Sequence, residues 1–256
     1  MGNELKFDQP VIIVGFSHSG TRLFAELLYD VGVFQVGQSK TFEWNYIQQL
    51  NDKIWSKWYD LTGISVGRIK QQSLLICKQE LLENLIGFGY KGKVWGFKDP
   101  RGTITLPAWL ERFPKAKVVI VIRHPYDVIG TLGDNYSKFS PNKRRPQEEI
   151  RFWSELWVKS YSFMFDFLEN NFSDSFSLVK YEELCSNPMH VIKQVVEKLH
   201  IEVSNYSSVN EMKIYPASKK YRKFLNDGHI SWDGLRVIAG VTESLSGKCN
   251  YDLDIS

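Results

Sequence analysis

The chain alternates short apolar segments with segments of helical periodicity, and this alternation limits the folds open to it more than any other feature. Each apolar segment is bounded by turn residues or charges and is therefore predicted to be a buried strand. We expect these strands at residues 11–14, 94–97, 118–122 and 176–179. Buried strands that alternate with helices form parallel sheets with both faces covered. The pattern predicts an α/β protein of three layers, a parallel sheet flanked by helices.

Three of the intervening segments carry a clear helical pattern. Residues 21–31 place their apolar side chains on a single stripe. Asn187 and Pro188 fit the N-cap and first position of a helix whose apolar face extends to residue 199. A third helix is predicted from Pro146, which precedes two acidic residues suited to a first turn, through residue 168.

Composition indicates one domain over residues 1–256, with 43% hydrophobic residues to form its core. The three cysteines lie far apart and form no CxxC pair, which argues against a zinc site or disulfide framework and favours a reducing compartment. The N-terminal residues lack the apolar core of a signal peptide, and no apolar run is long enough to cross a membrane. We expect a cytoplasmic protein, of open oligomeric state, that binds neither metal nor nucleic acid; a net charge of +3 is small.

Three segments interrupt the alternation. Residues 35–92 are rich in aromatic side chains and are predicted to form helices and loops that cover the acceptor side of a site. Residues 134–145 are polar and basic, and are predicted to form a surface loop. Residues 205–256 are predicted to form a C-terminal lid or tail, with a basic stretch at residues 219–223.

The glycine-rich turn at residues 15–20 lies between the first strand and the first helix. A turn of this kind presents backbone N–H groups and a helix N-terminus, which together bind phosphate. Its glycine spacing is that of a P-loop, but Thr21 and Arg22 stand where a nucleoside triphosphatase needs Lys and Ser or Thr for phosphate and Mg²⁺. The turn is therefore predicted to hold a phosphate without a metal; the alternative is a turn that binds no ligand.

A second phosphate site is predicted where the strand at residues 118–122 ends in Arg123. The guanidinium offers two parallel donors to a phosphate, and Pro125 is well placed to begin the next helix. Ligands of parallel sheets bind at the carboxyl ends of the strands, so both phosphate sites and the pair Lys98 and Asp99 are expected to face one crevice. The alternative is a surface arginine after a core strand.

These segments, in this order, resemble the sulfotransferases that use 3′-phosphoadenosine 5′-phosphosulfate (PAPS). Ser19-Gly20-Thr21-Arg22 matches their 5′-phosphosulfate loop, Arg123 and Thr131 match their 3′-phosphate site, and the segment around Tyr181 matches a third motif. The resemblance implies a fold like that of the P-loop nucleoside triphosphatases, 3′-phosphate contacts from Arg123 and Thr131, and Tyr181 near the adenine. The residues implied for the 5′-phosphate are Ser17, His18, Ser19, Gly20, Thr21 and Arg22. His18 departs from the family, which has Lys or Arg there, and a neutral imidazole would stabilise less charge.

The resemblance implies transfer of the sulfuryl group from PAPS to a hydroxyl acceptor, with carbohydrates among the candidates, and release of 3′,5′-ADP without a metal. Lys98 is the expected cation at the departing phosphate. Glu43, Asp99 and His18 are alternative general bases, although an ion pair with Lys98 would lower the pKa of Asp99 and weaken it as a base.

Two further residues are candidates for the acceptor side. Arg101 could bind the acceptor or the 5′-phosphate, or it could be a surface residue at a helix start. Trp44, in the aromatic stretch at residues 42–59, could stack on a sugar or an aromatic ring, but the core is favoured for this stretch.

Two other functions stay open at this point. A P-loop kinase that uses ATP is disfavoured by the missing Lys and Ser or Thr. A catalytically silent nucleotide-binding or adaptor protein of the same fold is compatible with His18 in the loop.

Overall fold

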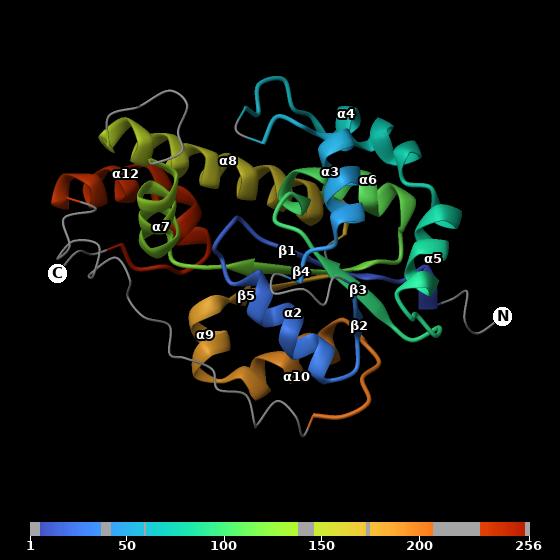
Figure 1. Cartoon of the computed structure of the whole chain (residues 1–256). Helices are drawn as coiled ribbons and strands as arrows, with labels where there is room; N and C mark the ends of the chain where they lie inside the picture. The colour runs from blue at the N-terminus through green and yellow to red at the C-terminus, as the bar shows by residue number, and fades with distance from the viewer. Residues whose placement is uncertain are drawn as a thin grey trace.

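The computed structural model describes residues 6–36, 42–58, 60–137, 146–172, 175–206 and 231–253. At its centre is a five-stranded sheet in the order β2-β3-β1-β4-β5, in which all neighbouring strands run parallel (Figure 1). The strands are β1 (Val11–Val14), β2 (Phe34–Gln35), β3 (Trp95–Lys98), β4 (Lys117–Ile122) and β5 (Phe176–Lys180). The predicted fold class is confirmed.

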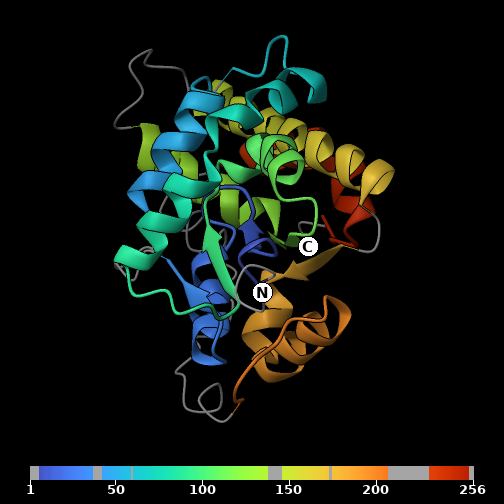
Figure 2. The same cartoon turned by 90° about the vertical axis from the view of Figure 1, so that its right-hand side faces the viewer.

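Helices cover both faces of the sheet, and the two views in Figures 1 and 2 agree on the layers. One face carries α2 (Thr21–Asp30), α9 (Tyr181–Ser186) and α10 (Pro188–Lys198). The other face carries α3 (Asn45–Ile54), α4 (Val66–Lys70), α5 (Lys78–Gly87), α6 (Gly102–Arg112), α7 (Pro125–Ser137), α8 (Pro146–Asn171) and α12 (Trp232–Lys248). A short 3₁₀ helix, Gln71–Leu75, follows α4.

The strands are apolar throughout because successive side chains point to opposite faces and both faces are covered. Val11 and Ile13 of β1 join the hydrophobic cluster under α2 and α10, whereas Ile12 joins the cluster under α6 and α8. All three side chains are fully buried. The central strand therefore holds the two hydrophobic clusters together.

The predicted strands and the three predicted helices are confirmed, with ends that differ by a few residues. The prediction of a loop at residues 134–145 is wrong at its start, because α7 continues to Ser137; residues 138–145 lie outside the described residues. The sequence does not predict β2, since a two-residue strand is too short to show a period.

The C-terminal part of the chain contributes to the core. Leu235, Ile238 and Leu245 of α12 are buried, and α12 packs against α8 and α7. The basic stretch at residues 219–223 lies outside the described residues. No helix in the described part of the chain is long and apolar enough to cross a membrane.

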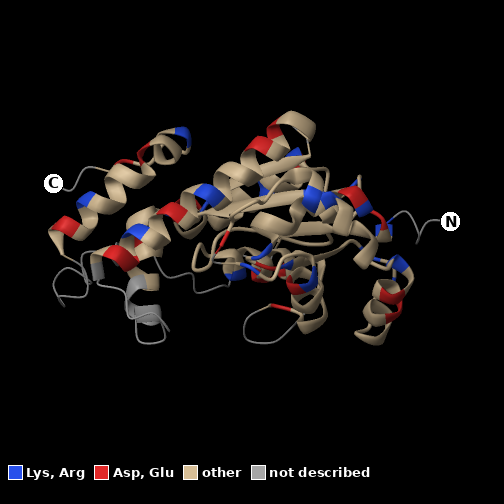
Figure 3. Cartoon of the chain, turned by 90° about the horizontal axis from the view of Figure 1, so that it is seen from above, with Lys and Arg blue, Asp and Glu red and all other residues tan. Residues whose placement is uncertain are grey.

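Charged residues of both signs are interspersed along the helices seen from above (Figure 3). This mixture agrees with the small net charge of +3. Electrostatic attraction to a polyanion needs charge of one sign gathered on a face. Among the described residues in this view, charge of one sign does not gather along the helices.

Close approach of two strand ends requires a glycine at position 15. A Cβ atom placed on Gly15 would lie 2.3 Å from the Val121 carbonyl oxygen and 2.8 Å from Cγ2 of Thr21. Both distances are too short for unbonded atoms, and the nearer atom belongs to the backbone of β4. The glycine therefore lets the loop after β1 lie directly against β4.

We expect Gly15→Ala to lower the free energy of unfolding by about 1–3 kcal/mol, because the loop must move away from β4. Urea denaturation would measure the change. Gly240→Ala is the matched control, because Gly240 lies in α12 with no atom within 4 Å of its added Cβ. That substitution should raise the free energy of unfolding by about 0.5–1 kcal/mol. Equal stability of the two variants would contradict the packing argument.

Candidate active site

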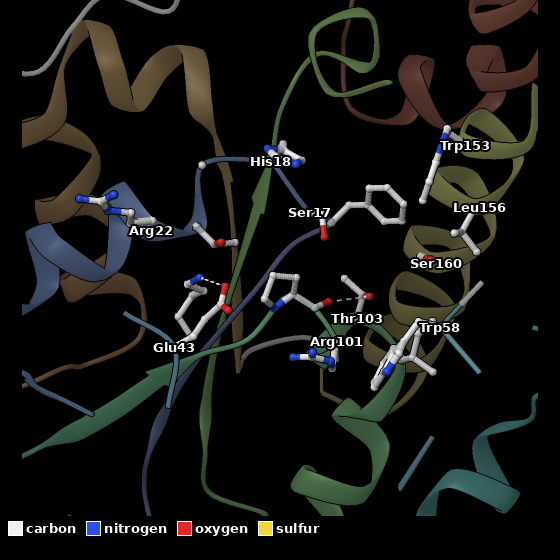
Figure 4. A pocket seen from close by; sticks show the side chains of 16 residues that line it. Ser17, His18, Arg22, Glu43, Trp58, Arg101, Thr103, Trp153, Leu156 and Ser160 are labelled. Atoms are coloured by element: carbon white, nitrogen blue, oxygen red, sulfur yellow. Dashed lines mark hydrogen bonds and ion pairs between the residues drawn. The ribbon is translucent and has the colours of Figure 1, made fainter. Parts of the chain in front are cut away.

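A cavity of about 640 Å³ lies at the carboxyl ends of β1 and β3. Its lining comes from the loop after β1, from the segment after β3, from α8, and from Glu43 and Trp58 (Figure 4). The loop after β1 and the start of α2 contribute Phe16, Ser17, His18, Gly20, Thr21 and Arg22. The end of β3, the residues that follow it and the start of α6 contribute Lys98, Pro100, Arg101, Thr103 and Ile104. This is the edge at which ligands of parallel sheets bind.

The loop after β1 is held by the hydroxyl of Tyr161, a fully buried residue of α8. The Phe16 N–H donates to this hydroxyl at 3.0 Å, and the hydroxyl donates to the Val121 carbonyl at 2.9 Å. Because its own proton is used there, the hydroxyl accepts from Ser19 Oγ at 3.0 Å. Burial raises the pKa of Tyr161 well above its usual range, so the phenol keeps its proton.

The loop ends in a helix N-terminus that no side chain of the described residues caps. Gly20 occupies the N-cap position of α2 in the left-handed conformation, with a φ of 91°. A Cβ atom there would lie 2.0 Å from the ring of Tyr181, so this position needs glycine for space as well as for φ. The first N–H groups of α2 therefore have no side-chain cap and carry the positive end of the helix dipole.

Lys98, at the end of β3, forms an ion pair with Glu43. Lys98 is only 4% exposed, whereas Glu43 is 24% exposed and also accepts a hydrogen bond of 2.6 Å from Gln48. Burial lowers the pKa of Lys98, and the Glu43 carboxylate opposes that shift. Both side chains line the cavity, so the structure places a cation and a carboxylate together at its edge.

Asp99 does not pair with Lys98, and the expectation of a lowered pKa at Asp99 is wrong. Its carboxylate accepts from Asn51 Nδ2 at 2.9 Å and from the N–H of Arg101 at 2.9 Å. Burial is the largest influence and raises its pKa, although Arg101 and Asn51 act in the opposite direction. Asn51 is itself fixed, because its oxygen accepts from Thr105 at 2.7 Å and Trp109 at 2.8 Å.

Arg101 lies between two carboxylates at the rim of the cavity. Its Nε is 3.1 Å from Asp52 and its Nη1 is 3.4 Å from Asp99. Its guanidinium carbon lies 5.5 Å from the centre of the Trp58 ring. The side chain is 30% exposed, so Arg101 is part of the site rather than an isolated surface residue.

Arg123 lies next to the loop, outside the lining of the cavity. Its Nη1 donates to the His18 carbonyl at 3.5 Å, its Nη2 contacts Asp127 at 3.0 Å, and its guanidinium lies 4.5 Å from the centre of the Tyr181 ring. Asp127 also links Thr131, whose hydroxyl donates to the Asp127 carbonyl at 2.7 Å. The three residues expected at the 3′-phosphate and adenine are thus connected to one another and to the loop.

A C-terminal segment lies against this second group of residues. Tyr251 Oη donates to Glu182 at 2.9 Å, and Glu182 also accepts from the backbone N–H of His124 at 2.9 Å. His124 Nε2 donates to the Asp252 carbonyl at 2.8 Å. Tyr251 therefore contacts Glu182, which follows Tyr181, and Asp252 contacts His124, which follows Arg123.

The structure brings most of the predicted site residues together. Ser17, His18, Gly20, Thr21, Arg22, Glu43, Lys98 and Arg101 line the cavity. Ser19 of the loop is buried, with its hydroxyl bonded to Tyr161, and does not line the cavity. Asp99 is 1% exposed and accepts a hydrogen bond from the N–H of Arg101. Trp44 lies elsewhere: it is 5% exposed, packs on Tyr46 and Phe88, and belongs to the core.

A sequence model of the sulfotransferase family matches residues 10–205, which is more than half of the chain. The chain belongs to the sulfotransferase family. The predicted family is thereby confirmed, and the match includes the loop, Lys98, Arg123 and Tyr181. The C-terminal segment at residues 251 and 252 lies outside the matched range.

Solved sulfotransferase structures share the fold of this family member. A sulfotransferase from Mycobacterium avium is 12% identical, with a TM-score of 0.61 over 96% of this chain and 77% of its own. A sulfotransferase from Alicyclobacillus acidocaldarius is 15% identical, with a TM-score of 0.52 over 95% of this chain and 96% of its own. Mouse sulfotransferase SULT7A1, complexed with PAP, is 15% identical, with a TM-score of 0.52 over 96% and 89%. No curated protein sequence matches the chain significantly.

Sequence reasoning missed the contribution of α8 to this sulfotransferase site. Trp153, Leu156 and Ser160 of α8 line the cavity, and Tyr161 holds the loop. Their spacing of three and four residues indicates one helix face, but it cannot show that the face meets the loop after β1, where Phe16 lies 145 residues before Tyr161. No cluster of three or more potential metal ligands occurs among the residues that the structure describes.

We expect Tyr161→Phe to lower the free energy of unfolding by about 1–3 kcal/mol, because the Phe16 N–H and the Val121 carbonyl lose a buried partner while the packing volume changes little. Urea denaturation would measure stability, and hydrogen exchange would show faster exchange at the Phe16 amide. Tyr29→Phe is the matched control, since Tyr29 is 41% exposed on α2. Unchanged exchange at Phe16 in Tyr161→Phe would contradict this role.

Proposed function

We propose that this sulfotransferase moves the sulfuryl group of PAPS to a hydroxyl acceptor and releases 3′,5′-ADP. The observation that carries the proposal is the contact of Arg123 with the His18 carbonyl, which joins two anion sites, one on each side of the loop. PAPS has phosphate at both its 3′ and 5′ positions. The match to the family and the PAP complex of the mouse relative support the same donor.

The residues present fit such a donor. The helix N-terminus at Gly20 has no side-chain cap among the described residues, so the N–H groups of Thr21 and Arg22 can bind the 5′-phosphate together with Ser17 and His18. Ser19 would support the loop rather than bind the phosphate, because it is buried and its hydroxyl donates to Tyr161. The buried Nε of Arg123 has no hydrogen-bond partner in the described part of the chain. Such an orphaned donor is costly unless a ligand satisfies it.

On the opposite side of the loop, Arg123 and Thr131 would bind the 3′-phosphate, and Tyr181 would lie near the adenine. Burial raises the pKa of Tyr181 to about 12, so its ring stays uncharged beside the guanidinium. Gly20 leaves the space that this ring occupies. The nucleotide would thus lie over the loop, with its sulfuryl end directed into the cavity.

Glu43 and Lys98 are the residues that would carry out the transfer step. As the acceptor oxygen bonds to sulfur, its proton passes to the Glu43 carboxylate, and the bond between sulfur and the bridging 5′-phosphate oxygen breaks. The electron pair of that bond stays on the phosphate oxygen, where Lys98 stabilises the new charge. Asp99 is less accessible as a base, because it is 1% exposed beneath Arg101 and does not line the cavity, whereas Glu43 is 24% exposed and does. His18 lies in the loop itself and is assigned to phosphate binding.

Neither of the other two functions gains support from the site. A kinase needs a lysine at position 21, and Arg22 instead pairs with Glu26 of its own helix at 2.6 Å. A silent adaptor has no need of the ion pair between Glu43 and the nearly buried Lys98, because a buried pair of this kind is costly to maintain.

We expect Arg123→Ala to weaken binding of 3′,5′-ADP by on the order of 30-fold, because one charge-assisted phosphate contact contributes about 2 kcal/mol. Calorimetry would measure the affinity, with 5′-AMP and ATP-Mg²⁺ as comparison ligands. Arg236→Ala is the matched control, since Arg236 is exposed on α12. A higher affinity for ATP-Mg²⁺ than for 3′,5′-ADP, unchanged by Arg123→Ala, would refute PAPS as the donor.

We expect Glu43→Gln to lower kcat by about 10²–10⁴-fold, since the amide keeps the shape and the contact with Lys98 but cannot take a proton. Initial rates of sulfuryl transfer and the affinity for 3′,5′-ADP would be measured together. The affinity should change little, which separates a catalytic loss from a binding loss. Glu83→Gln serves as the control, because Glu83 is an exposed carboxylate on α5 that does not line the cavity. Full activity of Glu43→Gln would assign the base elsewhere.

A further inference from the structure

The cavity has two unlike ends, and the difference bears on the acceptor. Arg22, Glu43 and Lys98 lie at one end, near the loop (Figure 4). The other end carries the apolar side chains of Trp58, which follows α3, and of Trp153 and Leu156 of α8 (Figure 4). Phe16 of the loop and Ile104 of α6 add further apolar surface to the lining. We call this second end the apolar wall.

Both tryptophans of the apolar wall have their polar atoms engaged away from the cavity. The indole N–H of Trp153 donates to Glu149 at 2.9 Å, and Glu149 is 3% exposed. The indole N–H of Trp58 donates to Asp52 at 2.7 Å. Trp58 is half-buried and Trp153 is 5% exposed, so the ring surface that a ligand can reach is mainly that of Trp58, and a ligand hydroxyl finds no free indole donor there.

Two of the polar residues next to the apolar wall, Thr103 and Arg101, are also engaged. Thr103 donates its hydroxyl to the Pro100 carbonyl at 3.0 Å. Arg101 is flanked by the carboxylates of Asp52 and Asp99, so this group of three has no excess positive charge for an acidic acceptor. Ser160 of α8 adds a hydroxyl to the same side of the cavity.

We infer that the acceptor is an uncharged alcohol or phenol whose hydroxyl is carried on an apolar body, and this inference rests on the function proposed above. The body lies on the apolar wall, where burial of carbon surface is favourable. The hydroxyl points to the other end, toward Glu43. Carbohydrates are disfavoured as acceptors. Their additional hydroxyl groups would lose hydrogen bonds to water on binding, and the indole N–H groups of the apolar wall are already bonded and cannot replace them.

The test compares a phenol and a sugar as acceptors for the full chain. With labelled PAPS, kcat/KM for 2-naphthol should exceed that for N-acetylglucosamine by on the order of 100-fold. Trp58→Ala should raise the KM for 2-naphthol by roughly 10-fold, since it removes part of the apolar wall, and Trp58→Phe should restore most of the affinity. Trp232→Ala is the matched control, because Trp232 is 56% exposed on α12.

Binding of 3′,5′-ADP to the same preparations separates the two proposals. Tight binding, together with preference for 2-naphthol and dependence on Trp58, supports both. Tight binding with preference for the sugar, with no sulfated naphthol, or with no effect of Trp58→Ala overturns the acceptor class and leaves the donor in place. Absence of 3′,5′-ADP binding overturns the proposed function, and the acceptor class with it.

Discussion

The hydroxyl of Tyr161 is the contact on which the geometry of the site depends. It accepts from the loop at Phe16, donates to β4 at Val121, and belongs to α8, so three elements distant in sequence meet at one buried atom. The Val121 carbonyl that it contacts is also the atom that excludes a side chain at Gly15. The Val121 carbonyl therefore fixes how closely the loop approaches the sheet. The position of the loop in turn fixes where the first N–H groups of α2 lie.

The cations at the edge of the sheet are all held by carboxylates. Lys98 pairs with Glu43, Arg101 with Asp52 and Asp99, and Arg123 with Asp127. A buried charge is costly unless it is paired and hydrogen-bonded, so these carboxylates make it possible to keep positive charge at the cavity before any ligand arrives. Fixed charges need no rearrangement during a reaction, which is the property that electrostatic catalysis requires.

The sequence predicts the features whose residues are consecutive, such as the strands, the loop at residues 15–20 and the helix after Pro188. It fails where partners are distant: Asn51 contacts Asp99, and Glu43 contacts Lys98, 55 residues away. The expected pair of Lys98 and Asp99 was wrong for a physical reason. Side chains of neighbouring residues at a strand end point to opposite faces, so adjacency in sequence separates them in space. Trp44 lies in the core, the location favoured from sequence for the aromatic stretch at residues 42–59, and does not line the cavity.

The contacts of the C-terminal segment also affect how the protein is assembled. His124 and Tyr126 donate to the carbonyls of Asp252 and Leu253, which lie 128 and 127 residues later in the chain. During synthesis, the strands and the loop emerge from the ribosome long before these carbonyls do. The corner of the sheet around Arg123 therefore gains these two hydrogen bonds only after residues 252 and 253 have been translated, and until then water takes the place of those partners.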